Sequence, residues 1–262
     1  MTAKPSIVRN QSKGAETFRK LHVPGNPLVL YNIWDPGSAK AAEQAGAKAI
    51  ATSSWAVAEA TGFSDGENTP IGVAIENLRR IVTSTELPVT VDLESGYGAT
   101  PKHVGETITL AINAGAVGCN LEDSFPTDGK LREIADQVAR IQGARQAADT
   151  VHLAFFINAR TDVFINTPTD EHNVAMVAEA LKRAEAYKKA GADGLFVPGL
   201  ADLTLIAKLT DASPLPINVL VRGSSPSISS LAKSGVARVS YGGTPYADLM
   251  GIFENTVREA TS

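Results

Sequence analysis

The sequence predicts an α/β protein built as a single (β/α)8 TIM barrel, and three observations support this fold class. Eight short apolar runs alternate along the chain with longer stretches of helical period. The runs follow one another at roughly 30 residues, a spacing that suits one strand and one helix per unit. No glycine-rich dinucleotide loop follows the first run, where an open doubly wound sheet often carries one. We therefore expect one domain over residues 1–262.

The expected strands are the apolar runs themselves, in chain order 28–33, 48–53, 88–93, 117–121, 152–158, 194–197, 216–221 and 236–240. Helices are expected between them, and residues 131–141 repeat apolar side chains at i, i+3, i+4 and i+7, as one face of a helix does. Four junctions place glycine just before a strand, at positions 46, 115, 191 and 235, which is typical of a left-handed helix C-cap. Residues 1–25 carry no strong pattern, and 245–260 predict a closing helix.

Composition excludes several classes of protein. The 28 acidic and 24 basic side chains give a net charge of −4, without the basic excess of a nucleic-acid binder. No apolar run reaches the roughly 18 residues of a membrane span, and the first 20 residues lack the apolar core of a secretory signal. We expect a soluble cytoplasmic protein. The single Cys119 excludes an internal disulfide, and its place inside an apolar run predicts a buried, inert thiol.

The ends of two neighbouring strands are unusually acidic. Asp92 and Glu94 are two residues apart at the end of the third run and share one face, and Glu122 ends the next strand. Three carboxylates at a barrel mouth repel one another unless a cation or proton relieves the charge, and oxygen ligands favour Mg2+ or Mn2+. The sequence therefore predicts a metal site of these three side chains. The alternative is that some of them cap helices or pair with surface cations, and Asp123 is the first acid we assign to capping.

Other polar residues at the same rim suggest an anionic substrate. Arg160 follows the fifth strand, and its planar fork can hold a carboxylate in two parallel hydrogen bonds, although a salt bridge to a nearby acid is the alternative. Ser53 and Ser54 end the second strand, where they could hold a second carboxylate or form a plain turn. The polar segment 61–67 is either a mobile lid carrying Asp65 over the site or an exposed loop.

These residues together make the sequence similar to the isocitrate lyase and phosphoenolpyruvate mutase superfamily. Residues 91–98, Val-Asp-Leu-Glu-Ser-Gly-Tyr-Gly, resemble its D-x-D-[ST]-G-[YF]-G metal motif. Leu-Glu-Asp at 121–123 resembles its acidic fourth-strand motif, and Ala-Arg-Thr-Asp at 159–162 its A-R-T-D motif. The similarity runs from about residue 28 to 245, with three motifs in order at suitable spacing.

The resemblance implies a barrel whose last helix packs on a neighbouring subunit, commonly in a tetramer of paired dimers. It implies Mg2+ held by Asp92, with Glu94, Glu122 and Asp65 contributing largely through water. By the same resemblance Ser53, Ser54 and Arg160 would bind the carboxylate of a small α-keto or α-hydroxy acid, and Asn218 matches a position that contacts substrate in the lyases. Asp65, Arg160 and Glu122 are the residues that we expect to act in catalysis.

Two departures from the superfamily pattern bear on the reaction. Glu94 stands where the motif has its second aspartate, which should shift a water-mediated contact without abolishing it. The lyases carry K-[KR]-C-G-H after the fourth strand, and the cysteine is their catalytic acid, but the loop 124–132 has neither Cys nor His. A true isocitrate or methylisocitrate lyase is therefore disfavoured. The loop also lacks the mutase K-T-N segment, and Pro198 lies where a mutase histidine is expected.

Three functions remain open on the sequence. The leading hypothesis is a Mg2+-dependent lyase that cleaves a C–C bond in a small α-keto or α-hydroxy (di)carboxylate through a metal-stabilised enolate. The second is a P–C bond mutase or hydrolase acting on phosphonopyruvate or phosphoenolpyruvate. The third is a non-catalytic keto-acid binding protein, which the missing acid-bearing loop suggests.

Overall fold

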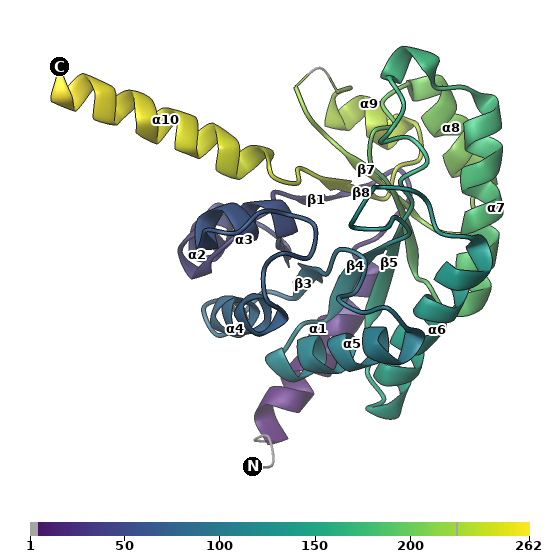
Figure 1. Ribbon diagram of the computed structural model, residues 1–262, viewed down its shortest axis with the longest axis horizontal. Helices are drawn as coiled ribbons and strands as arrows, with labels where there is room; N and C mark the ends of the chain where they lie inside the picture. Colours follow the sequence, from purple (N-terminus) through teal and green to yellow (C-terminus); the bar gives the residue numbers. More distant parts are fainter. Residues whose placement is uncertain (1–4, 224) are drawn as a thin grey trace.

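Eight parallel strands curl into a nearly closed barrel surrounded by helices, so the expected fold class is confirmed (Figure 1). The computed structural model describes residues 5–223 and 225–262. The sheet order is β1-β8-β7-β6-β5-β4-β3-β2, and a parallel bridge between Ile33 and Thr52 joins the two outer strands. The strands are β1 (Leu28–Leu30), β2 (Ile50–Ala51), β3 (Val89–Asp92), β4 (Gly118–Glu122), β5 (Phe156–Arg160), β6 (Gly194–Val197), β7 (Ile217–Leu220) and β8 (Arg238–Ser240).

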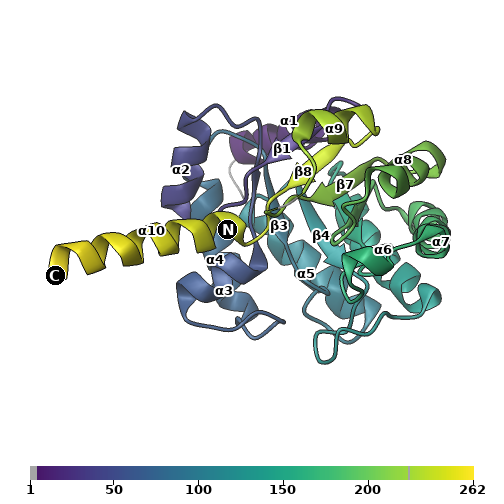
Figure 2. The same ribbon diagram turned by 90° about the horizontal axis from the view of Figure 1, so that it is seen from above.

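Helices follow the strands along the chain and cover the outside of the barrel (Figure 2). As expected for a left-handed cap, Gly115 ends α5 at φ 103° and Gly191 ends α7 at φ 105°. The helices are α1 (Pro5–Lys20), α2 (Pro36–Gln44), α3 (Ser54–Thr61), α4 (Ile71–Val82), α5 (Pro101–Ala114), α6 (Ile134–Thr150), α7 (Val174–Ala190), α8 (Leu203–Ala212), α9 (Ile228–Lys233) and α10 (Thr244–Thr261), with a 3-10 turn η1 (Thr169–Glu171).

Strand alternation divides the β4 side chains between the interior of the barrel and the helical layer. Cys119 and Leu121 are fully buried, whereas Asn120 belongs to the opposite face and lines a cavity inside the barrel. Burial raises the pKa of the Cys119 thiol, so it stays protonated and unreactive, as the sequence predicts. The outward faces therefore supply the apolar core, and the inward faces are free to carry polar chemistry.

The N-terminal segment differs from the expectation of no pattern, because it forms α1. Phe18 of this helix is fully buried and meets the ring of Phe156 edge-on at 5.5 Å, at the start of β5. The fifth strand was also expected too early, at 152–158, and His152 does not begin it. α6 continues to Thr150, and the turn that follows holds His152 at φ 53°, so β5 begins only at Phe156.

His22 follows α1 and carries a stability prediction. Its ring stacks on Phe156 at 4.0 Å, and burial, helped by the charge of Arg238, lowers the pKa of His22 to about 3. Below pH 6.5 the unfolded chain takes up a proton that the folded chain refuses, so stability falls as the pH falls towards 3. We expect unfolding at pH 5 to cost about 2 kcal/mol less than at pH 7 from this group.

Urea unfolding of the parent and His22→Phe at both pH values measures this contribution. Phenylalanine keeps the ring against Phe156 and removes the titration, so the variant should lose less stability on acidification. An equal loss in both proteins would contradict the assignment to His22.

The last helix, α10, extends away from the barrel (Figures 1 and 2). Of its side chains only Pro245 is buried. Its exposed large apolar side chains are Leu249, Met250, Ile252, Phe253 and Val257. The closing helix is confirmed, while its packing on a neighbouring subunit stays a prediction. Within the part of the chain that the structure describes, no helix combines the length and apolarity needed to cross a membrane.

Candidate active site

A cavity of about 380 Å3 opens at the carboxyl ends of the strands, where barrels of this type build their active sites. Its volume suits a small ligand. Polar side chains from several strands and the loops after them line it together with an apolar wall. The polar set is Asn32, Ser53, Ser54, Asp65, Asp92, Asn120, Arg160, Arg222, Ser240 and Thr244, and the apolar set includes Trp55, Ile165, Phe196, Pro198 and Leu220.

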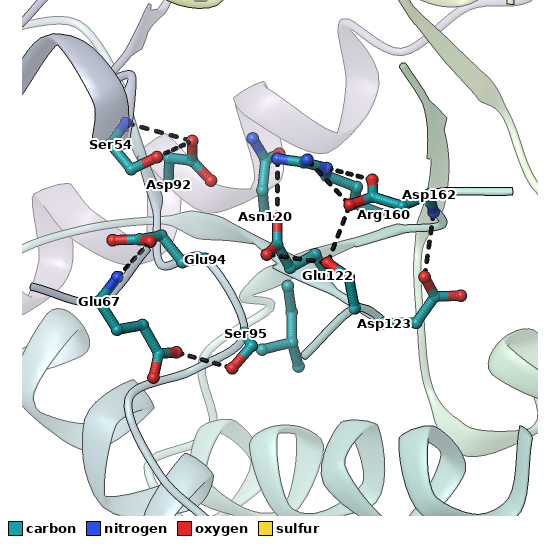
Figure 3. Close-up of polar contacts among 12 residues, drawn as sticks. Ser54, Glu67, Asp92, Glu94, Ser95, Asn120, Glu122, Asp123, Arg160 and Asp162 are labelled. Atoms are coloured by element: carbon teal, nitrogen blue, oxygen red, sulfur yellow. Dashed lines mark hydrogen bonds and ion pairs between the residues drawn. The ribbon is translucent and has the colours of Figure 1, made fainter. Parts of the chain in front are cut away.

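Asp92 ends β3 and faces this cavity with one carboxylate oxygen engaged. The backbone N–H and the hydroxyl of Ser54 donate to Oδ2 at 3.2 and 3.0 Å, and the second oxygen points away from Ser54 (Figure 3). Asp65 lines the same cavity from the loop after α3. Desolvation and then the charge of Asp92 raise the pKa of Asp65. Asp65 and Asp92 therefore repel each other on the same side of the cavity.

Glu94 lies behind Asp92 and does not line the cavity. Its backbone is held at φ 50°, and its carboxylate accepts from the N–H of Glu67 at 2.6 Å and the hydroxyl of Tyr97 at 2.9 Å. The side chain is buried, and burial followed by the charge of Asp65 raises the pKa of Glu94 to about 7. An uncommon backbone conformation at a non-glycine residue is often retained at functional sites.

Glu67 is a residue that sequence reasoning passed over within the segment 61–67. Its carboxylate accepts from the Ser95 hydroxyl at 2.7 Å and from the Tyr97 N–H at 2.8 Å, while its own backbone N–H donates to the carboxylate of Glu94. These bonds tie the Asp65-bearing loop to the loop after β3. In this conformation the segment is anchored over the site, and the sequence offered no signal for a pairing between loops about 28 residues apart.

Arg160 reaches the cavity from the end of β5 and also forms the salt bridges that were its alternative interpretation. Its Nη1 lies 2.8 Å from Glu122 Oε2, and Nε and Nη2 donate to Asp162 at 2.7 and 3.0 Å (Figure 3). Burial alone would lower the pKa of Arg160, but the charges of Glu122 and Asp162 outweigh it and raise the pKa. A guanidinium has five N–H donors, so two remain after these three contacts.

Glu122 and Asp123 have separate tasks at the end of β4. Glu122 pairs with Arg160 and accepts from the Ser124 hydroxyl at 3.0 Å, and it does not line the cavity. Asp123 was expected to cap a helix, but it is fully buried and accepts from Tyr187 Oη at 2.7 Å and from Arg183 Nη1 at 3.0 Å. It thereby fastens α7 to the barrel, because a buried carboxylate requires charged and hydrogen-bonding partners.

The chemistry of the donor set fits a divalent cation. Asp65 and Asp92 face one cavity, and their mutual repulsion is the charge imbalance that a cation would relieve. Mg2+ usually takes one or two carboxylates and keeps several waters. Within residues 5–223 and 225–262 no group of three or more His, Cys, Asp or Glu side chains is arranged to hold a metal directly. Asp65 and Asp92 are the carboxylates that line the cavity, while Glu94 and Glu122 do not line it.

The remaining predicted residues divide between the cavity and its surroundings. Ser53 and Ser54 both line it, and the Ser53 hydroxyl also caps α3. Asn218 lies beneath it, with its amide nitrogen donating to the carbonyl oxygens of Val219 and Arg238 at 3.0 and 3.2 Å. The cavity wall at β7 comes instead from Leu220 and Arg222. Leu220 and Asn120 carry neither a charge nor a hydroxyl group, so the sequence pattern at the strand ends did not single them out.

The loop 124–132 is folded away from the cavity. Its ends pair through an antiparallel bridge between Ser124 and Leu131, and the Ser124 hydroxyl oxygen lies 3.0 Å from Glu122 Oε1 and 2.8 Å from Asp162 Oδ2, within donating distance of either carboxylate. The guanidinium of Arg132 stacks on the Phe125 ring at 4.0 Å. In this conformation the loop brings no acid to the cavity, so the position of the lyase cysteine has no counterpart there.

Comparison with known proteins places these features in a family. The family model described as phosphoenolpyruvate phosphomutase matches residues 18–261. A crystal structure of a proposed phosphonomutase from Burkholderia cenocepacia J2315 is 51% identical, covers 95% of this chain and 99% of its own, and superimposes with a TM-score of 0.94. A Mycobacterium tuberculosis protein named only as uncharacterised is 36% identical over 88% of this chain and 83% of its own. The 2-methylisocitrate lyase of Escherichia coli K12 is 29% identical over 80% of this chain and 71% of its own.

Proposed function

Because the chain belongs to the phosphoenolpyruvate phosphomutase family, we propose that it is a Mg2+-dependent lyase that cleaves a C–C bond in a small α-keto or α-hydroxy (di)carboxylate. The observation that carries this proposal is the distribution of charge in the cavity. Asp65 and Asp92 form an acidic side suited to a cation, and Arg160 supplies a basic group suited to a carboxylate. A substrate with a carbonyl next to a carboxylate could use both at once.

The protein's own groups have defined tasks in such a reaction. Arg160 would bind the substrate carboxylate with the two N–H donors that Glu122 and Asp162 leave free. Ser53 would bind from the opposite rim. Asp92 would hold Mg2+, which supplies Lewis-acid stabilisation of an enolate oxygen when bound. Asp65 lines the cavity beside Asp92 and would contribute to the Mg2+ site through water.

The second candidate is chemistry at a P–C bond. It is favoured by the 51% identical structure, which is described as a proposed phosphonomutase, and by the description of the family model. The missing loop acid does not separate the two reactions. C–C cleavage can proceed by decarboxylation, in which the departing CO2 needs no proton from an acid. The two candidates differ in the bond broken, and product analysis distinguishes them.

A metal-dependent screen tests the proposal. The protein, with Mg2+ and then with a chelator, is incubated with oxaloacetate, malate derivatives, methylisocitrate and phosphonopyruvate, and products are identified by proton and phosphorus NMR. Chelator-sensitive cleavage of a C–C bond is the expected result. Turnover of phosphonopyruvate and of no other substrate would contradict C–C cleavage and support P–C bond chemistry. Binding of these acids without turnover would support a keto-acid binding protein.

We also propose that α10 joins subunits into a homo-oligomer, as a dimer of dimers. Its support is the set of exposed apolar side chains on a helix that leaves its own barrel, since burial of such side chains favours association. Ile252 and Phe253 are 62% and 63% exposed.

Phe253→Asp should lower the mass measured by light scattering, because a carboxylate would replace an apolar contact. Val174→Asp is the matched control, since Val174 is 59% exposed on α7 and should leave the mass unchanged. A monomeric parent protein would contradict the proposal.

A further inference from the structure

Arg238 is a fully buried arginine inside the barrel whose contacts are all with neutral groups. Its Nε donates to the Ser240 hydroxyl at 3.3 Å and its Nη2 to Asn120 Oδ1 at 3.3 Å, while Nη1 has no hydrogen-bond partner among the described residues. Burial lowers the pKa of Arg238 to about 9, against the opposing charge of Asp92. A buried charge with no carboxylate in contact is costly, and replacing such a charge by an apolar side chain is often neutral or stabilising. A role other than stability would explain its presence.

Arg238 belongs to a hydrogen-bonded row of amides across the barrel interior. The direction of each amide follows from groups that can only accept or only donate. Asn218 Nδ2 faces the carbonyl oxygens of Val219 and Arg238, which only accept, so its Oδ1 faces Asn158. Asn158 must then present its Nδ2, which lies 3.1 Å from Asn218 Oδ1 and 2.9 Å from Asn120 Oδ1.

The row ends at Asn120, and Arg238 fixes its amide. Asn120 Oδ1 receives two donors, one from Asn158 and one from Arg238, which occupy both lone pairs of the carbonyl oxygen. A flipped amide would set its NH2 group against the guanidinium, which has no acceptor. Asn120 lines the cavity, and Figure 3 shows it between Asp92 and Arg160. With Oδ1 held inside the barrel, the Nδ2 donor is left for the cavity.

We propose that Asn120 donates a hydrogen bond from Nδ2 to a substrate oxygen, and that Arg238 is a positioning residue that holds the Asn120 amide in this orientation. The inference rests on the proposed function, because it requires an oxygen-rich ligand between Asp92 and Arg160. It adds a neutral donor to the cavity lining between Asp92 and Arg160, which favours a ligand that presents an acceptor oxygen there. It also accounts for a charged side chain at a buried position, which packing alone does not explain.

Calorimetric binding of oxalate with Mg2+ and thermal unfolding test both parts. Oxalate is a suitable probe because its two adjoining carboxylates resemble the enolate form of an α-keto acid. Arg238→Met removes the charge and keeps the length, so we expect oxalate affinity to fall about tenfold while the melting temperature stays the same or rises. A residue with a merely structural role would lower the melting temperature and leave affinity unchanged.

Asn120→Asp is the second variant and remains informative if Arg238→Met does not fold. Its carboxylate can pair with Arg238, so the fold should be retained, but it presents an acceptor in place of the Nδ2 donor. Oxalate affinity should fall by about tenfold or more because a hydrogen bond is lost and a like charge is added. Arg145→Met is the matched control, since Arg145 bonds Gly191 and Asp193 away from the cavity and should lose stability without losing affinity.

The outcomes separate this inference from the proposed function. Tight binding of oxalate by the parent, with unchanged affinity in Arg238→Met and Asn120→Asp, would overturn the inference and leave the proposed function standing. Weaker binding by Asn120→Asp alone would retain Asn120 as a donor and remove Arg238 from its positioning role. No oxalate binding by the parent with Mg2+ would overturn the proposed function and the inference that rests on it.

Discussion

Asp92→Asn is expected to reduce metal-dependent turnover by ~10^3-fold or more, the largest effect of any single change in this protein. The loss corresponds to about 4 kcal/mol, the order of a bound metal's stabilisation of developing charge. Asparagine keeps the shape of the side chain and can still accept from Ser54. It removes the negative charge that Asp92 presents to the cavity and that would hold Mg2+. Turnover on the responsive substrate and Mg2+ binding by calorimetry should fall together.

Asp193→Asn is the matched control for this prediction. Asp193 pairs with Arg145 at 2.6 Å and with Arg19 at 2.7 Å, and it precedes β6, at the end of the barrel remote from the cavity. The control should lose stability and retain Mg2+ affinity. If Asp92→Asn bound Mg2+ and turned over substrate as the parent does, the proposed metal site would be wrong.

Arg160→Lys is expected to weaken oxalate binding by about 10- to 100-fold with the overall charge unchanged. Arginine presents a planar fork, of which two N–H donors remain for a ligand after the contacts with Glu122 and Asp162. Lysine offers a point charge that cannot serve two carboxylates and a substrate in the same plane. The effect should fall on affinity and KM, because the lost bonds hold the substrate before and during reaction.

Arg132→Lys supplies the comparison for that change. Arg132 is buried, pairs with Asp136 and stacks on Phe125, and it does not line the cavity. It should bind oxalate as the parent does. Equal affinity in Arg160→Lys and the parent would mean that Arg160 only neutralises Glu122 and Asp162, the structural interpretation that the sequence left open.

The fold could be predicted from the sequence because its signals are local. Alternating apolar runs mark the strands, and glycines such as Gly115 and Gly191 mark the helix ends, since each depends on a few neighbouring residues. Prediction failed where distant contacts decide the structure. α1 is amphipathic, but the surface that its apolar side chains cover, such as the ring of Phe156 against Phe18, lies 138 positions along the chain.

The candidate site divides in the same way. The position of Asp92, Arg160 and Ser54 at strand ends is enough to predict that they meet at one cavity, because parallel strands bring their carboxyl ends to one face. Sequence position could not say which carboxylates remain free. The carboxylate of Glu94 accepts from Glu67 and Tyr97, and that of Glu122 pairs with Arg160 and accepts from Ser124. Glu67 belongs to another loop and Arg160 to another strand, so neither contact could be read from the neighbouring residues.

The sequence by itself determined the order of the strands, the end of the barrel that carries the chemistry and the acidic and basic residue types gathered there. Only the tertiary structure decided the direction of each donor. Asn120 presents its N–H to the cavity because Asn158 and Arg238, from β5 and β8, take its oxygen. Hydrogen-bond direction depends on which groups meet across the barrel, and residues far apart in sequence meet only after the sheet has closed.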